Sequence, residues 1–415
     1  MIIKRINPGL SLAICPTKKF KDITINLRFY WPLSKETLAY SNYCSELISW
    51  QCAKYPTKES FSRHLDYLYG ATYVASSEVS GTQVCLSAAL KVIKGSFVNE
   101  NLLPEQLLTL IEVVFHPCLQ GQAFDVMLFN EARNNLLANI ARDCDNPASY
   151  AASRASEIFG ENYPLAVTNL SIKEQIENAD NKKIYLWYQS LLQQAYCDII
   201  AVGDVTAAEL QSLVDKIADS ERRECGALDY VKKFNEYREV KETGAIQQSQ
   251  LRLLFQSSLN MRSANFYHLM VANALFGQIP TSLLFQEVRE KRSLCYSIYS
   301  RNLTYDTGLV VSTGIDKANI EETIVLVKKL YEQVKIGDFS EELLQMAKDL
   351  VVNALQASYD RVFGYINTAV ALIHVSPKHN IDHICALVKA VKKDDVCACF
   401  SQLRLETVYS YQQED

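Results

Sequence analysis

The second half of this sequence repeats the first, and the repeat limits the possible folds more than any other feature. Matching residues recur at two constant offsets, 224 and 215 positions. The matches are Pro56 with Pro280, Thr57 with Thr281, Phe61 with Phe285, Phe124 with Phe339, Ala132 with Ala347, Asp145 with Asp360 and Tyr150 with Tyr365. Each half also carries an expected hairpin in the same place, over 72–90 and 295–315. The pattern predicts two related domains.

Periodicity gives the class of fold. Period-two apolar alternation predicts strands over 10–14 and 23–31, paired as an antiparallel opening. Further strands are expected over 72–78 and 82–90, and a short buried strand over 197–202. Helical spacing follows over 41–50, 57–69, 105–114 and 124–142, and again after Asp145-Asn-Pro through Phe159. A capping box at Thr206–Glu209 opens another helix. Strands and helices come in runs, without regular βαβ alternation, which indicates an α+β fold. We expect two largely antiparallel sheets with helices on one face, enclosing a cleft.

Charge and composition place the boundaries of the domains and exclude some functions. The segment after Ser220 is charged and weakly patterned, so we expect domains at 1–222 and 246–415 with a linker at 223–245. The net charge of −5 and the lack of a basic block argue against nucleic-acid binding. No apolar run reaches the roughly 20 residues of a membrane span, and no secretion signal begins the chain. We therefore expect a soluble cytoplasmic protein, whose 12 scattered cysteines are free thiols.

A helix that runs directly into a strand forms the most suggestive local segment, Phe285–Ser300. Arg289 falls on the last turns of the helix, and Tyr296 falls at the start of the strand, on one face with Ile298 and Ser300. A helix folded back on the strand would bring the guanidinium and the phenol together. Two such donors suit a peptide carbonyl or a developing oxyanion. An ordinary helix–strand junction with a surface arginine fits the same spacing.

The run Arg-Glu-Lys-Arg-Ser-Leu-Cys-Tyr-Ser-Ile-Tyr-Ser from Arg289 to Ser300 resembles the arginine/tyrosine segment of the insulinase- or pitrilysin-type (M16) zinc peptidases. The resemblance covers essentially the whole chain and is strongest to bacterial members without the zinc motif, the YmfF-like group. It implies the two-domain fold of that family (metallopeptidase, LuxS/M16-like). It also implies that Arg289 and Tyr296, in the second domain, contact substrate opposite a zinc ion.

The zinc motif of this family is His-x-x-Glu-His on a helix, completed by a downstream Glu, with one position left for water. The resemblance places the two histidines at about Asn42 and Glu46, the general base at about Ser45 and the downstream ligand nearest Asn139. None of these positions has the required residue. We therefore expect no metal and no catalytic residue in this chain. Glu46 and Glu131 are expected to be solvated or ion-paired.

A second histidine pair has the spacing of the motif. His379 and His383, with Asp382 in the place of Glu, follow Pro377 and precede an apolar helical pattern. Asp at this point suits the first turn of a helix. A helix start explains the segment, and a metal site there remains the alternative.

The resemblance implies a chain that is inactive alone and that supports proteolysis only with a partner bearing the zinc motif. In that heterodimer the zinc belongs to the partner, and Arg289 and Tyr296 hold the peptide. Three alternatives remain open: an assembly subunit without peptide contact, an accessory protein that binds peptide without cleaving it, and an independent metallopeptidase using His379 and His383. A homodimer of the isolated chain is also possible.

Overall fold

The computed structural model describes residues 1–378 and 380–414 and contains two large sheets. The first sheet has the order β1-β2-β8-β3-β5-β4 and the second the order β11-β12-β10-β13-β9. Their strands are β1 (Ile2–Asn7), β2 (Leu10–Pro16), β3 (Asp22–Pro32), β4 (Thr72–Ser80), β5 (Gln83–Ile93), β8 (Tyr196–Gly203), β9 (Arg238–Gly244), β10 (Ser249–Gln256), β11 (Cys295–Leu303), β12 (Gly308–Ile315) and β13 (Arg404–Gln413). A small separate hairpin joins β6 (Leu119–Gln120) to β7 (Ala123–Phe124).

The two sheets share one plan. Apart from β1, each strand of the first sheet has a counterpart in the second: β2 with β9, β8 with β13, β3 with β10, β5 with β12, and β4 with β11. The parallel pairs, β2–β8 and β13–β9, also correspond, and the other ladders are antiparallel. The structure therefore confirms the predicted α+β class with antiparallel-rich sheets.

Helices follow the strands in each half. Those of the first half are α1 (Lys35–Leu47), α2 (Lys58–Tyr67), α3 (Leu103–Phe115), α4 (Val126–Asp145), α5 (Pro147–Phe159), α6 (Lys173–Glu177), α7 (Asn181–Gln194) and α8 (Gln211–Ala218). Those of the second half are α9 (Phe266–Asn273), α10 (Ile320–Lys335), α11 (Glu341–Ser358), α12 (Val362–His374), α13 (Ile381–Ala390) and α14 (Lys393–Ser401). Two π-helices, η4 (Ala274–Gln278) and η5 (Phe285–Glu290), precede β11.

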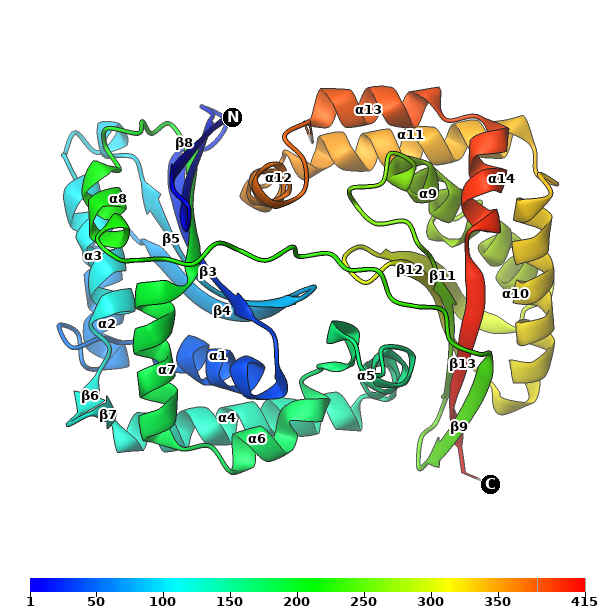
Figure 1. Cartoon of the computed structure of the whole chain (residues 1–415), viewed down its shortest axis with the longest axis horizontal. Coiled ribbons are helices and arrows are strands. Elements are labelled where there is room, and N and C mark those ends of the chain that lie inside the picture. The colour runs from blue at the N-terminus through cyan, green and yellow to red at the C-terminus, as the bar shows by residue number, and fades with distance from the viewer. Residues whose placement is uncertain (379, 415) are drawn as a thin grey trace. The chain divides into compact units, whose positions relative to one another are not determined.

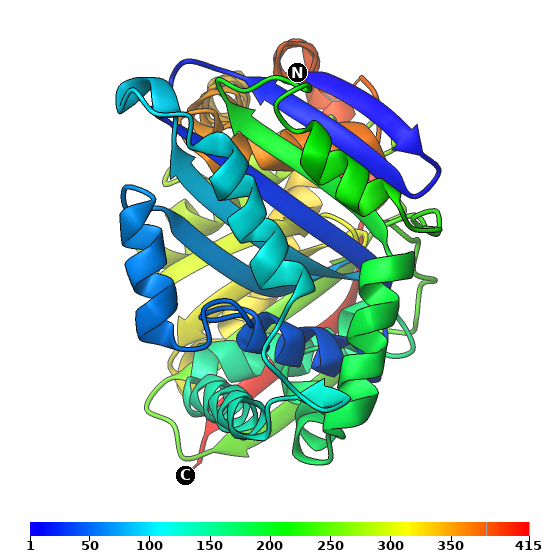
Figure 2. The same cartoon turned by 90° about the vertical axis from the view of Figure 1, so that its left-hand side faces the viewer.

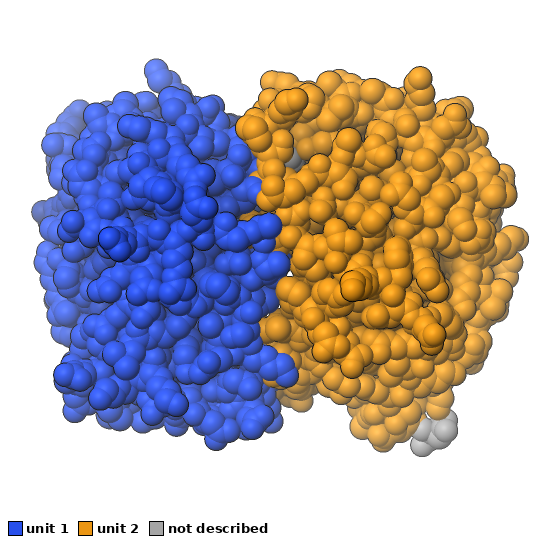
Figure 3. Space-filling view, in the orientation of Figure 1, with its two compact units in different colours: residues 1–140, 172–227, 361–374 blue, residues 141–171, 228–360, 375–415 orange. Residues whose placement is uncertain are grey.

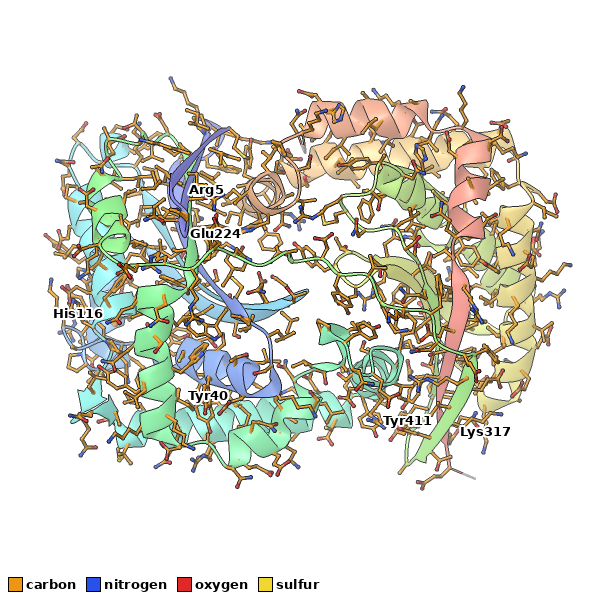
Figure 4. The ribbon with its side chains drawn as sticks, viewed as in Figure 1. Arg5, Tyr40, His116, Glu224, Lys317 and Tyr411 are labelled. Atoms are coloured by element: carbon orange, nitrogen blue, oxygen red, sulfur yellow. The ribbon has the colours of Figure 1, made fainter. Side chains whose placement is uncertain are left out.

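The chain forms two compact units, which Figure 3 shows in different colours. Each unit includes one helix from the other half of the sequence. Unit 1 comprises residues 1–140, 172–227 and 361–374, and unit 2 comprises 141–171, 228–360 and 375–415. Helix α12 thus belongs to unit 1, where it contacts β2 and β8, and α5 belongs to unit 2, where it contacts β10 and β13. The switch after Ala227 falls inside the predicted linker, but the sequence did not predict the exchanged helices.

Each unit has helices on both faces of its sheet. In unit 1, α1, α3, α7 and α8 contact one face (Figure 2), and α12 packs against β2 and β8. In unit 2, one large apolar core joins the sheet to α9, α10, α11 and α14. A smaller core joins the other face to α5 (Figure 1) and contains Ala151, Ala155 and Phe159 from that helix.

Three local expectations were wrong. Strands β2 and β3 do not pair, because β8 lies between them, parallel to β2 and antiparallel to β3. The short segment between β2 and β3 is long enough to step over one strand, since neighbouring strands lie about 4.8 Å apart. Residues 238–244, assigned to the linker, form β9 against β13. The Thr206–Glu209 box forms its hydrogen bonds, but the helix begins only at Gln211.

Two further expectations concern chemistry and environment. Within residues 1–378 and 380–414 no disulfide joins any of the 12 cysteines, and each cysteine is at least partly buried. Within residues 1–378 and 380–414, no helix has the length and apolar character needed to cross a membrane.

Candidate functional site

Arg289 and Tyr296 lie side by side at the start of β11. The guanidinium carbon of Arg289 is 5.5 Å from the centre of the Tyr296 ring and 4.4 Å from the centre of the Phe285 ring. Arg289 therefore stands between two aromatic rings, an arrangement that restrains the guanidinium through cation–π attraction. The structure brings together the two residues that the helix–strand spacing indicated.

Two irregularities of the backbone produce this arrangement. Helix η5 is a π-helix, in which the N–H of Lys291 donates to the carbonyl of Gln286 five residues earlier, at 3.0 Å. On the strand, Cys295 is opposite Ile315 and Ser297 is opposite Gly314, so Tyr296 is the extra residue of a β-bulge. Both irregularities are frequent near functional sites, where they re-aim side chains.

The bulge corrects one expectation from the sequence. Tyr296 was expected on one face with Ile298 and Ser300, but those two residues are buried whereas Tyr296 is 81% exposed. The extra residue breaks the period-two alternation and turns the phenol outward. No sequence pattern signals a bulge here, because no glycine marks it.

The surroundings of the pair favour binding over covalent catalysis. Strand β11 is an edge strand, so one side of its backbone is free to pair with an added strand. The neighbouring thiol, Cys295, has its pKa raised by burial, although Thr313 and Arg289 oppose the shift. A protonated thiol is a poor nucleophile. Arg289 forms a long ion pair of 3.4 Å with Glu290, and such half-exposed pairs contribute little to stability.

The positions matched to the zinc motif lie on α1. Ser34 and Thr37 form the capping box that begins this helix. Asn42, Ser45 and Glu46 are all partly buried on it. The hydroxyl of Ser45 donates to the carbonyl of Asn42 at 2.8 Å, within the helix.

Helix α4 packs against α1 through Asn135 and Phe129. The α4 side chain that bonds Glu46 is Asn135, whose Nδ2 donates to Oε2 at 3.2 Å. Asn139 is exposed one turn further along. Stacking of Tyr43 on Phe129, with centroids 4.8 Å apart, fixes the two helices together. The assignment of Asn139 to the degenerate site stays a prediction, and the geometry makes Asn135 the better counterpart.

These residues do not fit a zinc ion. Zinc in such sites takes imidazole, thiolate or carboxylate ligands, three of them from the protein. Glu46 is the only such group among the matched positions, and Glu131, which lines the same cavity of about 30 Å³, is ion-paired with Lys58 at 2.6 Å. Within the described part of the chain, no three His, Cys, Asp or Glu side chains come together as a metal site would require.

The second histidine pair is only partly within the structure. His379 lies outside the described residues. His383 is exposed in the first turn of α13. Its backbone N–H donates to the side-chain oxygen of Asn380, the N-cap residue. The helix start expected at this point is present.

Fold and site together define a protein with two related units, in which the positions matched to the zinc motif offer no set of zinc ligands. The family model for the peptidase M16 inactive domain matches residues 178–351. The probable inactive metalloprotease YmfF of Bacillus subtilis is 26% identical over 414 residues, covering 98% of this chain and 96% of YmfF. The antilisterial bacteriocin subtilosin biosynthesis protein AlbE of the same organism is 23% identical and covers 86% of this chain and 88% of AlbE.

Solved structures agree on the fold. A conserved protein from Enterococcus faecalis superposes with a TM-score of 0.93 at 23% identity, covering 100% of this chain and 98% of that one. The chain is similar to M16 peptidases over the residues that the family model matches, and its sequence contains no His-x-x-Glu-His motif.

Proposed function

We propose that this chain is the non-catalytic subunit of a heterodimeric zinc peptidase that acts on peptides. The convergence of Arg289 and Tyr296 at an exposed edge strand carries the proposal. Arg289 and Tyr296 keep an arrangement that suits substrate binding. The positions matched to the zinc motif, in contrast, do not have the residues that bind zinc. The partner is a family member that bears the zinc motif, and it supplies the metal chemistry.

In this role the chain binds and orients the peptide. The guanidinium of Arg289 and the phenol of Tyr296 donate hydrogen bonds to a substrate carbonyl, and they support the negative charge that develops on its oxygen. The free edge of β11 provides backbone groups for an extended segment, so an unfolded peptide is a better substrate than a folded protein. This chain alone is inactive in the proposal.

The test uses the complex of this chain with a family member from the same genome that bears the zinc motif. It compares variants of two neighbouring arginines of this chain. Arg289→Ala removes the proposed donor, and we expect kcat/KM on a fluorogenic peptide to fall about 10²–10³-fold. Arg292→Ala removes an exposed arginine three residues away, paired with Glu322 at 2.8 Å, and should leave kcat/KM unchanged. Equal activity of both variants and the unmodified complex would show that the chain is only an assembly subunit.

A second candidate is an accessory role in the handling of a peptide without cleavage. The similarity to AlbE, a bacteriocin biosynthesis protein, favours this candidate. Cleavage products in the presence of the partner would exclude this candidate. The cytoplasmic location and the homodimer remain predictions. An independent metallopeptidase would instead require stoichiometric zinc in the isolated chain.

A further inference from the structure

The shared strand plan lets the two units be compared position by position. In unit 1, Arg28 on β3 is buried, with 8% of its side chain exposed, and its guanidinium forms an ion pair with Glu78 on β4. The strand register gives the position of Glu78 relative to Arg28. Cys85 on β5 is opposite Glu78 on β4 and opposite Tyr30 on β3, two residues after Arg28. In unit 1, therefore, a glutamate from the edge strand neutralises a buried arginine.

Unit 2 has the same arginine but not the glutamate. Arg252 on β10 stands 224 positions after Arg28, the offset already seen at the first set of repeated residues. Val310 on β12 is opposite Arg301 on β11 and opposite Leu254 on β10, two residues after Arg252. Arg301 therefore occupies, on the edge strand β11, the register position that Glu78 occupies on β4. An arginine–glutamate pair in one unit is replaced by two arginines in the other.

The second carboxylate near the arginine is also replaced. In unit 1, Asp198 on β8 is directly opposite Arg28. In unit 2, Tyr409 on β13 is directly opposite Arg252. The hydroxyl of Tyr409 donates at 2.8 Å to Glu242, a carboxylate that Arg154 already holds.

Arg252 is consequently a buried cation without an anion. It is 4% exposed, and in the part of the chain that the structure describes the acceptors of its guanidinium are neutral oxygens. Those acceptors are the carbonyls of Leu251, Thr313 and Ala148 and the side-chain amide of Gln250. Burial lowers the pKa of Arg252, and the nearby Arg301 acts in the same direction. Over the described residues no carboxylate forms an ion pair with either arginine, and an unpaired buried charge is costly.

The two arginines open into one groove. A cavity of about 280 Å³, here called the arginine groove, lies between α5 and the sheet of unit 2. Its polar lining consists of Arg252, Arg301, Tyr299, Ser149, Ser156 and Ser312. The first turn of α5 lines it as well, but the amides of Ala148 and Ser149 are capped by Asn146, so that turn adds only its dipole. The groove has two positive charges, several hydroxyls and no carboxylate in its lining.

We propose that the arginine groove binds a carboxylate of the substrate peptide, from an acidic side chain or from the chain terminus. The ligand then takes the place that Glu78 fills in unit 1. Guanidinium groups bind carboxylates through paired hydrogen bonds, which makes them selective for this shape of anion. Arg301 follows Tyr296 by five positions on β11, roughly 16 Å along an extended strand. A peptide lying along β11 would reach both. This inference rests on the proposed peptide binding and adds a substrate class to it.

The test measures peptide binding by the isolated full chain, without the partner. The probes are a fluorescein-labelled unstructured peptide with one glutamate and the same peptide with glutamine, each with a free or an amidated C-terminus. We expect a Kd about tenfold lower or better for the peptides with a carboxylate, a preference that weakens as salt is added. If the tighter binding is lost on Glu→Gln exchange, the bound carboxylate belongs to the side chain. If it is lost on amidation, the bound carboxylate is the C-terminus of the peptide.

Variants of the exposed arginine then locate the effect. Arg301→Glu recreates the pairing of unit 1, so it should abolish the preference and raise the melting temperature by pairing Arg252 internally. Arg404→Glu makes the same change of charge on β13 outside the groove and should keep the preference. The inference is overturned if the chain binds both peptides equally, or if Arg301→Glu retains the preference. No binding of any peptide would overturn the proposed function as well, so the two failures are distinguishable.

Discussion

The ammonium of Lys232 lies 2.6 Å and 2.7 Å from the two carboxylate oxygens of Glu406, and both side chains are fully buried. The ammonium also lies 4.5 Å from the centre of the Phe159 ring on α5. This pair ties the irregular segment before β9 to the sheet of unit 2. Because burial of two charges is costly, the pair matters chiefly when one partner is removed.

Lys232→Met should therefore destabilise the protein strongly, because Glu406 would be left buried and unpaired. We expect a loss of about 3–5 kcal/mol in the free energy of unfolding, measured by urea denaturation followed by circular dichroism. The double variant Lys232→Met/Glu406→Leu should recover most of it. Lys241→Met breaks an exposed pair with Glu321 and serves as the control, with an expected loss below about 1 kcal/mol. Similar losses for both single variants would contradict the assigned role of burial.

Phe285 should act as a positioning residue for Arg289, because its ring contacts the guanidinium face. In the proposed heterodimer, Phe285→Leu should lower kcat/KM about three- to thirtyfold, while Phe285→Tyr, which keeps an aromatic face, should restore it. Steady-state kinetics on a fluorogenic peptide measures both. A purely structural role would be indicated if the two variants lose activity in proportion to their loss of thermal stability.

Treatment with a chelator should leave the thermal stability of the isolated chain unchanged. The positions matched to the zinc motif offer one carboxylate and no imidazole, so no ligand set is available there. We expect the same melting temperature with and without a chelator, and metal analysis should find less than stoichiometric zinc. A fall in melting temperature on chelation that zinc reverses would direct attention to His379 and His383.

Glu242 should contribute stability that depends on pH. Burial raises the pKa of Glu242, but hydrogen bonds from Arg154 and Tyr409 outweigh it and leave the pKa below its ordinary value. A carboxyl with a lowered pKa stabilises the folded state above the unfolded pKa, about 4.3, and loses that contribution as the pH falls through the folded pKa. The stability difference between the unmodified protein and Glu242→Gln should therefore be largest near neutral pH and shrink in acid. A constant difference would contradict this assignment.

Local signals in the sequence predicted the elements that depend on local interactions. Thr57 caps α2 as expected, and Gly81, at a φ of +59°, turns the hairpin of β4 and β5. The pairing of Arg289 with Tyr296 was accessible for the same reason, since seven residues separate them. The bulge at Tyr296 was not, because its cause is the register with β12 rather than a local preference.

Features that depend on distant segments could not be read from periodicity. Strand β8, which lies between β2 and β3 in the sheet, follows β2 by almost two hundred residues in the sequence. The contrast between Glu78 and Arg301 likewise emerges only when the registers of both sheets are known. An apolar stripe shows that a helix is buried but not which sheet buries it, so the exchange of α5 and α12 also lay beyond the sequence.

The exchange of helices sets an order for synthesis on the ribosome. The last strand of the first sheet ends at Gly203, but α12 begins only at Val362. Its His374 forms a hydrogen bond with Asp198 at 2.7 Å, and the His374 ring lies 4.8 Å from the Tyr30 ring, between centroids. At about 5–20 residues per second, roughly 8–30 s pass between the emergence of the two. During this time the nascent sheet exposes an uncovered face that includes Asp198. Completion of the first half of the chain is thus delayed until most of the second half has been translated, which makes this interval the vulnerable stage for aggregation or chaperone capture.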